Sequence, residues 1–451
     1  MLLLALAGIG SASAVLYGLG FSLTPLLVEA GLAAPGKGPL AAYPALASGL
    51  YGLSLLAALL VFRRGTPRGG MGLILAFSVV FRLLVLLTPP TLSDDMYRYI
   101  WEGRIQRAGF SPYQLTPEAP VLAGLRDTAI YPHVNRPSAV TIYPPGAQAF
   151  FLAIQVGLPD SVTGFRAVLV VADLFSILLV MGLLRRLDLD PGRAILYAWS
   201  PLTVFELSQS GHVDALMIPL VLLALWLRLQ GRMAGAGLAL GLATLVKLYP
   251  ISLLPALARP REWRLPAAFA ATVALGYLPH VLRVGGQVVG FLPRYFGPWE
   301  DFNIGLRGVV EVVLAPLVDH PREAALLLCW GALAGCALYV YWRRAEAPVE
   351  QKAGWMAAAF LLLQPQSLHP WYVAWVIPFL CIRPVWGWVY FSGAVSLSYL
   401  KYVQEPPHLP GWVWAAEFLP LYGLLLLQGV GGLRPAPSLP GRLAVAGDHR
   451  T

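Results

Sequence analysis

Long apolar runs alternate with short polar intervals along almost the whole chain. Many of these runs approach the roughly 20 residues that a helix needs to cross a bilayer. The first are at 2–28, 41–62 and 71–87, and the last ends near Gln428. This pattern predicts an all-α fold, a polytopic transmembrane bundle with about twelve spans. The first run has no basic segment before it and continues past its small residues, which favours a retained span over a cleaved signal peptide.

The composition indicates a membrane protein and argues against a nucleic-acid partner. Hydrophobic residues make up 57% of the chain and charged residues only 12%, whereas a soluble domain carries roughly 25% charged residues. The net charge is +9, but the basic residues are scattered over short loops, as is typical of the cytoplasmic side of membrane proteins. We therefore expect a multi-pass protein of the cell inner (plasma) membrane, in contact with membrane lipids and without a nucleic-acid partner.

The basic loops set the expected orientation. The loop 63–70 contains three arginines and no acid, and the positive-inside rule places such a loop in the cytoplasm. The span 71–87 then ends outside, and 89–161 becomes a large extracytoplasmic loop with short interfacial helices. If its apolar stretch 147–158 crossed the membrane, the next basic loop would lie outside, so we expect this stretch to be re-entrant or interfacial.

The same argument predicts a broken helix further along the chain. One straight span through 233–258 would place a basic segment outside. A break at Lys247–Pro250 resolves the conflict with two short helices that form a V, because proline removes a helix hydrogen bond. Broken helices at membrane depth are tolerated where they are buried or line a cavity, so we expect Lys247 to point into a polar cavity. We expect a single transmembrane domain at 1–433 and a disordered cytoplasmic tail at 434–451.

The polar stretch 91–113, TLSDDMYRYIWEGRIQRAGFSPY, concentrates the candidate chemistry. Asp94 and Asp95 stand at the exit of a span. Three further charged residues follow at near-helical spacing: Arg98, Glu102 and Arg104. Ionisable residues packed against the end of a span indicate a functional site. Helix capping after Ser93 is the structural alternative, because acids are favourable in a first turn, but capping needs one acid and does not explain the arginines.

Other polar and aromatic residues are expected on the same face of the membrane: Tyr143, His212, Asp214, Lys247, His369, Trp371 and Tyr372. An external carboxylate suits a general base that takes a proton from an acceptor hydroxyl. Arginine and lysine suit a phosphate group, and aromatic rings can stack on sugar faces.

Most of these residues also have a simpler explanation. His212 and Asp214 can form a helix-start cluster, Lys247 can snorkel to the interface, and His369 can fix a turn. Single aromatic residues are common in interfacial belts. A divalent cation is a further option, and its ligands would be Asp94, Asp95, His212 and Asp214. No ligand spacing specifies a metal site.

Five motifs in one order carry a family resemblance: SDDMYRYIWEGRIQRAGFSPY, TIYPP, GHVDAL, VKLYP and HPWYVAWVIPF. Together they resemble the GT-C superfamily of integral-membrane glycosyltransferases, and especially bacterial polyprenol-phosphate-mannose-dependent α-mannosyltransferases. The resemblance covers about 83–379. It implies a polyprenyl-phosphate-sugar donor, a lipid or glycan acceptor, an inverting displacement at the anomeric carbon and an active site outside the membrane. The leaving group is a polyprenyl monophosphate, which does not always require a metal.

The resemblance also implies roles for particular residues. The catalytic acid of the first external loop is Asp94 or Asp95, with a slight preference for Asp94. Lys247 and His369 contact the donor phosphate or assist the base, so His369 joins the two aspartates as a catalytic candidate. The remaining candidates are expected to bind the donor phosphate or the substrate: Arg98, Glu102, Arg104, Tyr143, His212, Asp214, Lys247, Trp371 and Tyr372.

Three other functions remain open on the sequence. A transporter or flippase for lipid-linked or small polar substrates would also have broken helices and buried charge. Many transporter folds contain inverted repeats and bind at the midplane; here no repeat is visible and the polar residues concentrate on one face. A ligase that uses a diphosphate-linked oligosaccharide is the alternative within enzymes, and a non-catalytic assembly factor is the third.

Overall fold

A computed structural model describes residues 1–22, 24–29, 34, 36–363, 366–403 and 406–431. Within these ranges the regular elements are all helical, and the only bridge between extended residues joins Phe302 and Ser367. The expectation of an all-α membrane bundle is confirmed. The predicted tail at 434–451 lies outside the described residues.

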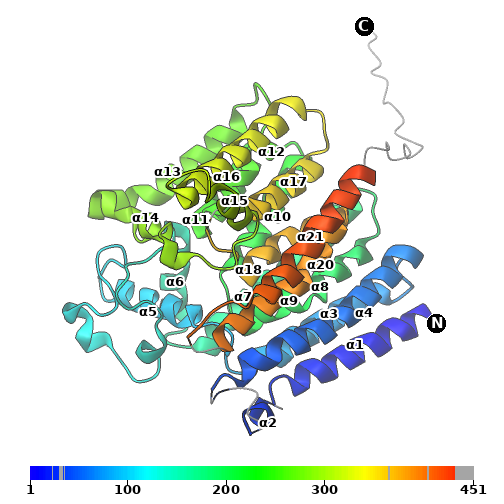
Figure 1. Ribbon diagram of the computed structural model, residues 1–451, viewed down its shortest axis with the longest axis horizontal. Coiled ribbons are helices and arrows are strands. Elements are labelled where there is room, and N and C mark those ends of the chain that lie inside the picture. The colour runs from blue at the N-terminus through cyan, green and yellow to red at the C-terminus, as the bar shows by residue number, and fades with distance from the viewer. Residues whose placement is uncertain (23, 30–33, 35, 364–365, 404–405, 432–451) are drawn as a thin grey trace.

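Three long apolar helices at the N-terminal end lie side by side (Figure 1). They are α1 (Leu2–Leu19), α3 (Gly38–Arg64) and α4 (Gly70–Leu86), with a short α2 (Thr24–Glu29) between the first two. The first run therefore ends at Leu19 and not at 28 as predicted. The chain leaves the helix at Gly20, whose φ of 47° is in a region that glycine adopts without steric cost.

The external loop contains two helices packed against each other. They are α5 (Asp95–Arg107) and α6 (Pro145–Gly157), and between them lie the short turns η1 (Pro120–Leu125) and η2 (Tyr131–His133). At Gly103 a Cβ atom would lie 2.5 Å from the carbonyl oxygen of Phe151, so glycine permits this close approach. The 13 residues of α6 extend about 20 Å at 1.5 Å per residue. This is too short to cross a bilayer, as predicted for this stretch.

The central part of the bundle is interrupted near the candidate site. Its elements are α7 (Val162–Arg186), η3 (Pro191–Ala194), α8 (Ile195–Ala198), α9 (Pro201–Thr203), the π-helical turn η4 (Val204–Gln209), α10 (Asp214–Leu229) and α11 (Met233–Val246). At Lys247 the backbone is extended, with φ −143° and ψ 144°. The chain then resumes as η5 (Tyr249–Leu253) and α12 (Leu254–Leu257). The predicted break at Lys247–Pro250 is confirmed.

The second half of the chain adds further helices and two stretches of short turns. Its elements are α13 (Arg264–Val284), η6 (Gly285–Val289), α14 (Leu292–Tyr295), η7 (Pro298–Glu300), α15 (Leu306–Leu314), α16 (Pro321–Leu338), η8 (Tyr339–Arg343), α17 (Val349–Leu362), α18 (Pro370–Val373), η9 (Ala374–Val376), α19 (Ile377–Ile382), α20 (Trp386–Ala394), η10 (Val395–Val403) and α21 (Gly411–Gly431). The segment between η6 and α14 lies beside the external loop, because the backbone N–H of Phe291 donates to the carbonyl oxygen of Thr141. The loop before α18 is joined to the segment after η7, because the backbone N–H of Leu368 donates to the carbonyl oxygen of Phe302.

The bundle has two distinct ends. At one end Thr66 bonds the carboxylate of Asp190 at 2.7 Å, which joins the two basic loops. At the other end Gln209 donates to the backbone of Pro89 at 2.8 Å, beside the start of the external loop. The 17 residues of α4 separate these ends by about 25 Å, close to the thickness of a bilayer core.

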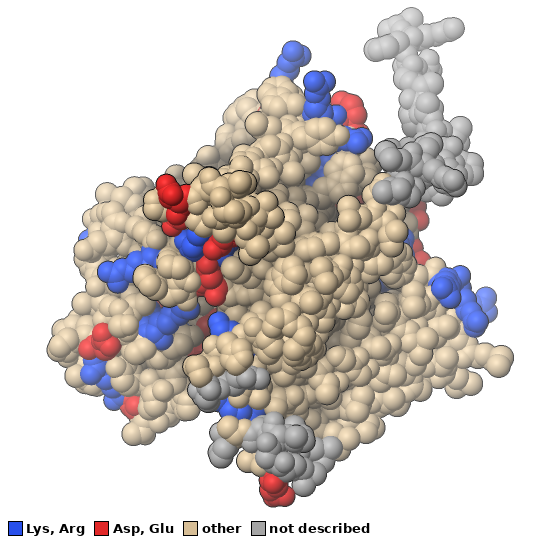
Figure 2. All heavy atoms as spheres, viewed as in Figure 1, with Lys and Arg blue, Asp and Glu red and all other residues tan. Residues whose placement is uncertain are grey.

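The lipid-facing surface fits this arrangement. Within the part of the chain that the structure describes, five helices are long and apolar enough to cross a membrane and three shorter ones are apolar. The count of about twelve crossings stays a prediction. Figure 2 shows a broad surface over α21 and α1 without charged side chains, with charged groups toward its margins. Leu426 and Leu427 on α21 are 69% and 71% exposed. Large exposed apolar side chains of this kind are costly in water and favourable in lipid.

Candidate active site

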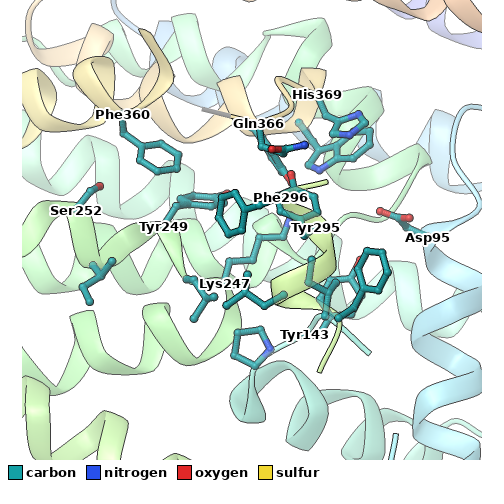
Figure 3. A pocket seen from close by; sticks show the side chains of 18 of the residues that line it. Asp95, Tyr143, Lys247, Tyr249, Ser252, Tyr295, Phe296, Phe360, Gln366 and His369 are labelled. Atoms are coloured by element: carbon teal, nitrogen blue, oxygen red, sulfur yellow. The ribbon is translucent and has the colours of Figure 1, made fainter. Parts of the chain in front are cut away.

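A cavity of about 650 Å³ opens between the external loop, the broken helix after α11 and the turns before α18. This volume is in the range of typical ligand sites. One end is polar and is lined by Asp95, Arg98, Asn135, Arg136, Lys247 and His369. The other end is apolar and is lined by Ile251, Trp330, Leu333, Ala337, Met356 and Phe360. Figure 3 shows Asp95 and His369 on one side of the cavity, Phe360 and Ser252 on the other, and Lys247 with Tyr249 between them.

Asp95 is the acid at the polar end. It is the first residue of α5, and its backbone N–H donates to Ser93 Oγ at 3.3 Å. Its Oδ1 accepts a hydrogen bond from Asn135 at 2.7 Å, and its Oδ2 lies 3.4 Å from His212 Nδ1. Burial alone would raise the pKa of Asp95, but His212, Lys247 and Asn135 together hold it below its usual range. Asp95 is therefore ionised at neutral pH and faces the cavity.

Asp94 has a different environment. It is the N-cap residue of α5, but its side chain makes no capping hydrogen bond. The residue is exposed and does not line the cavity. Nearby protein atoms still remove part of the water around its carboxyl, and this partial desolvation raises the pKa of Asp94. Of the two candidate aspartates the structure brings only Asp95 to the cavity, which is the reverse of the slight preference from sequence.

His212 lies between two carboxylates. Its Nδ1 faces Asp95 and its Nε2 faces Glu206 Oε2, each at 3.4 Å. The ring is buried and stacks on Trp371 with centroids 3.9 Å apart. Burial lowers the pKa of His212, but the two carboxylates outweigh this effect and raise it above its ordinary value. His212 is therefore more than a helix-start residue, because its ring also lies against Asp95.

Lys247 and Asp214 form an ion pair at the cavity wall. Lys247 Nζ lies 2.6 Å from Asp214 Oδ2, and the hydroxyl of Tyr249 donates to the other oxygen of Asp214. The ammonium group also lies 5.1 Å from the ring centroid of Tyr372. The break after α11 places Lys247 in the cavity, as predicted, while Asp214 lies behind it at the start of α10.

Aromatic rings form a continuous stack beside the acid. Trp371 stacks between His212 and His369, and the centroids of Trp371 and His369 are 4.4 Å apart at an interplanar angle of 9°. Phe302 covers the other face of His369 at 4.6 Å. Burial lowers the pKa of His369 to about 3. His369 is therefore neutral at physiological pH, and its position supports packing and neutral hydrogen bonding rather than cationic contact with a phosphate.

Arg98 and Glu102 are near the cavity but are occupied by structural contacts. Arg98 pairs with Glu102 at 2.6 Å and donates to the backbone oxygen of Ala139 at 2.8 Å. The second oxygen of Glu102 accepts from Thr141 and Gln148 at 2.8 and 2.5 Å. These bonds fix the loop that carries the cavity residues. The structure thus gives the pair a positioning role.

Two predicted binding residues fall in different places. Tyr143 lines the cavity, with its hydroxyl 3.3 Å from that of Tyr99. Arg104 does not line the cavity; it pairs with Asp127 at 2.6 Å and Asp160 at 2.8 Å on the outer side of the loop. Arg104 is six residues beyond Arg98, which places it on another face of α5.

Several site residues were missing from the sequence-based set. Asn135 and Arg136 lie in an irregular part of the external loop, and Glu206 lies in the turn η4. Arg136 has a positive φ of 49° and pairs with Glu300 at 2.5 Å, which joins the external loop to η7. In the sequence, the polarity of Asn135, Arg136 and Glu206 was the one feature that could have indicated a place in the site. Among the described residues, no cluster of three or more His, Cys, Asp or Glu side chains is arranged to hold a metal ion.

Comparison with known proteins gives the family. Residues 2–259 match the model for the N-terminal domain of alpha-(1->6)-mannopyranosyltransferases, which is more than half of the chain. The chain belongs to this family. The match contains Asp95, His212 and Lys247, while the His369–Trp371 segment lies beyond it. The family assignment agrees with the resemblance drawn from the five motifs.

One curated relative extends the comparison. The chain is 24% identical over 334 residues to a protein of Mycobacterium tuberculosis named alpha-(1->6)-mannopyranosyltransferase A. The matched region is 66% of this chain and 63% of the relative. The chain therefore matches less than two thirds of that relative's length, so the relative's activity and substrates come to this chain only as a proposal.

Proposed function

We propose that this protein is an inverting membrane mannosyltransferase. It transfers mannose from a polyprenyl-phosphate donor to a hydroxyl of a lipid or glycan acceptor on the extracytoplasmic face of the inner membrane. The observation that carries the proposal is the amphipathic cavity, in which the ionised Asp95 lies at one end and an apolar surface at the other. The family supplies the sugar and suggests a (1->6) linkage, hence a primary hydroxyl as the nucleophile.

The shape of the cavity suits a lipid-linked sugar phosphate. The apolar end is lined from α16 and α17 by residues such as Leu333 and Phe360, and burial of a prenyl chain there is favourable by about 25 cal/mol per Å². Lys247 and Arg136 line the polar end and can compensate the charge of a phosphate. Tyr143 presents a ring of the kind that stacks on sugars, whereas both faces of Trp371 are covered by His212 and His369.

The reaction needs one base. Asp95 accepts the proton of the acceptor hydroxyl as its oxygen bonds to the anomeric carbon, while the bond from that carbon to the phosphate oxygen breaks and the electron pair leaves with the polyprenyl phosphate. Two described carboxylates line the cavity, Asp95 and Glu102. Both oxygens of Glu102 are engaged by Arg98, Thr141 and Gln148. A second carboxylate free to act as a nucleophile is absent from this lining, which favours single displacement with inversion.

The decisive experiment measures transfer from radiolabelled polyprenyl-phosphate-mannose to membrane lipid extracts. The purified wild type is compared with Asp95→Asn and with the adjacent Asp94→Asn. We expect Asp95→Asn to lower transfer at least a thousandfold, in line with loss of a general base, with donor binding retained, and Asp94→Asn to stay within a few-fold of wild type. Full activity in Asp95→Asn would refute the proposed mechanism. Absence of transfer by the wild type with this and other lipid-linked mannose donors would refute the function.

A further inference from the structure

Glu206 is a buried acid that the proposed reaction does not use. It lies in the π-helical turn η4, and its side chain is fully buried. A carboxylate without compensation is costly to bury. π-helical turns are rare and occur frequently at functional sites. The position of this acid therefore needs an explanation.

The surroundings of Glu206 consist of hydrogen-bond donors. The hydroxyl of Tyr399 lies 3.0 Å from both carboxylate oxygens, and that of Tyr43 lies 3.5 Å from Oε1. His212 Nε2 lies 3.4 Å from Oε2. Two tyrosine hydroxyls and one imidazole nitrogen thus face this carboxyl group within 3.5 Å. Each of these groups can donate to an ionised carboxylate, which accepts only, so the surroundings can satisfy Glu206 in its ionised form.

The two carboxylates beside His212 indicate the protonation state of its imidazole ring. A neutral imidazole has one donor and one acceptor nitrogen, whereas an imidazolium has two donors. Both nitrogens of His212 face carboxylate oxygens, those of Asp95 and Glu206. The stacked ring of Trp371 fixes the plane of the imidazole. The arrangement is therefore that of an imidazolium between two carboxylates.

Local backbone geometry maintains this contact. The backbone N–H of His212 donates to the carbonyl oxygen of Glu206 at 3.0 Å, which closes the turn after η4. Gly211 has a φ of 73°, and a Cβ atom there would lie 2.0 Å from the terminal carbon of Met96. The left-handed φ favours glycine directly before His212, and the turn presents the imidazole to the start of α5.

We propose that Glu206 is a positioning residue that acts on Asp95 through His212: it keeps the imidazole protonated and oriented, and the imidazolium in turn keeps Asp95 ionised and aimed into the cavity. This inference rests on the proposed function for its catalytic meaning. It extends the site to residues that never contact substrate, including Tyr43 on α3 and Tyr399 on η10.

The other charged and titratable groups around these side chains do not replace Glu206. Asp95 faces Lys247 and Asn135, and its charge also reaches Tyr402 on η10. His369, from the segment before α18, is the other titratable group near His212 and is neutral at physiological pH. Removing Glu206 therefore leaves Asp95 with Lys247 as its cationic neighbour, and this ammonium already has Asp214 as its partner.

The first test measures the protonation of His212 directly in the full-length protein in detergent micelles. Nitrogen-15 histidine spectra at neutral pH identify His212 by its loss in His212→Gln. We expect an imidazolium signal in the wild type and a neutral imidazole in Glu206→Gln. A neutral His212 in the wild type, or an imidazolium that persists in Glu206→Gln, would overturn the inference. This readout does not depend on transfer activity.

The second test measures the pH dependence of kcat/KM for mannose transfer. In Glu206→Gln the loss of the imidazolium raises the pKa of Asp95, so we expect the acid limb to move to higher pH by about one unit or more. We expect kcat to fall at least tenfold at the pH of the wild-type optimum, with little change in KM. A lower kcat with an unmoved acid limb would show a purely structural role and overturn the inference.

Matched variants control for folding. Ser208→Ala lies in the same turn, and its buried hydroxyl makes no hydrogen bond within the described structure, so we expect a wild-type profile. Tyr399→Phe removes one hydrogen-bond donor from Glu206. We expect it to move the acid limb of the kcat/KM profile to higher pH, by less than Glu206→Gln does. This variant provides the test if Glu206→Gln does not fold. An imidazolium that depends on Glu206 in a protein without transfer activity would support the coupling and refute the proposed function alone.

Discussion

His369 shows how the environment of a single residue limits its chemistry. Its ring is stacked between Trp371 and Phe302, and burial lowers its pKa to about 3. A histidine near pKa 6.5 can exchange protons at physiological pH, but this one stays neutral. The role inferred from the family resemblance, assistance to the base or contact with the phosphate, is therefore restricted to neutral hydrogen bonding and packing.

Replacement of the imidazole ring by a phenyl ring tests whether His369 acts mainly through packing. We expect His369→Phe to retain at least about a tenth of wild-type transfer, because stacking is preserved, with an unchanged pH profile between 5 and 8. We also expect a flatter dependence of the melting temperature on pH. In the wild type the unfolded chain gains the His369 proton below about pH 6.5 and the folded state does not, so stability falls as pH drops toward 3. A loss of transfer as large as that of Asp95→Asn would instead make His369 essential to the chemistry.

The two neighbouring aspartates show what the sequence could not provide at this scale. Asp94 and Asp95 have the same chemistry and nearly the same position on the chain. They differ in their partners, and the partners of Asp95 come from positions 135, 212 and 247. Such contacts depend on tertiary packing. The sequence motif therefore narrowed the candidate acid to Asp94 or Asp95, and only the folded structure distinguishes the two.

At the scale of elements, the external loop depends on one buried charged pair. Arg98 and Glu102 lie one turn apart on α5, and their bonds to Thr141, Gln148 and three backbone oxygens tie this helix to the segment 135–148. This segment carries Asn135, the partner of Asp95. The loop thus forms a fixed support for Asp95.

Removal of one member of this pair should destabilise the protein strongly. We expect Glu102→Leu to lower the free energy of unfolding by about 3–5 kcal/mol, because it leaves the buried Arg98 without its carboxylate. The control is Glu118→Gln in the same loop, which is exposed and should stay within about 0.5 kcal/mol of wild type. Thermal unfolding in detergent measures both. Equal melting temperatures for the two variants would contradict the support role.

Element boundaries were predictable where their causes are local. The short α6 and the break at Lys247 both agree with what Lys and Arg bias combined with span length predicts along the chain, while the interfacial placement of α6 stays a prediction. The end of α1 at Leu19 did not, since a single glycine inside an apolar run is weak evidence for a break. The placement of Arg104 away from the cavity also depended on contacts with Asp127 and Asp160, from outside its helix.

At the scale of the whole molecule, the basic loops and the candidate site lie at opposite ends of the bundle. The basic loops are joined by Thr66 and Asp190, whereas the site surrounds the start of α5. α10 connects the two ends, because it begins at Asp214 beside the cavity and runs 16 residues away from it. With the positive-inside rule this arrangement predicts an extracytoplasmic site.

Cysteine labelling of spheroplasts tests this orientation. The three native cysteines are first replaced by alanine, and single cysteines are then introduced at two exposed positions, Thr128 in the external loop and Gln230 after α10. We expect a membrane-impermeant maleimide to label Thr128→Cys in spheroplasts and to label Gln230→Cys only after the membrane is permeabilised. The reverse pattern would place the cavity in the cytoplasm, where an outward-facing lipid-linked donor could not reach Asp95. Labelling of both positions in intact spheroplasts would contradict a membrane-spanning α10.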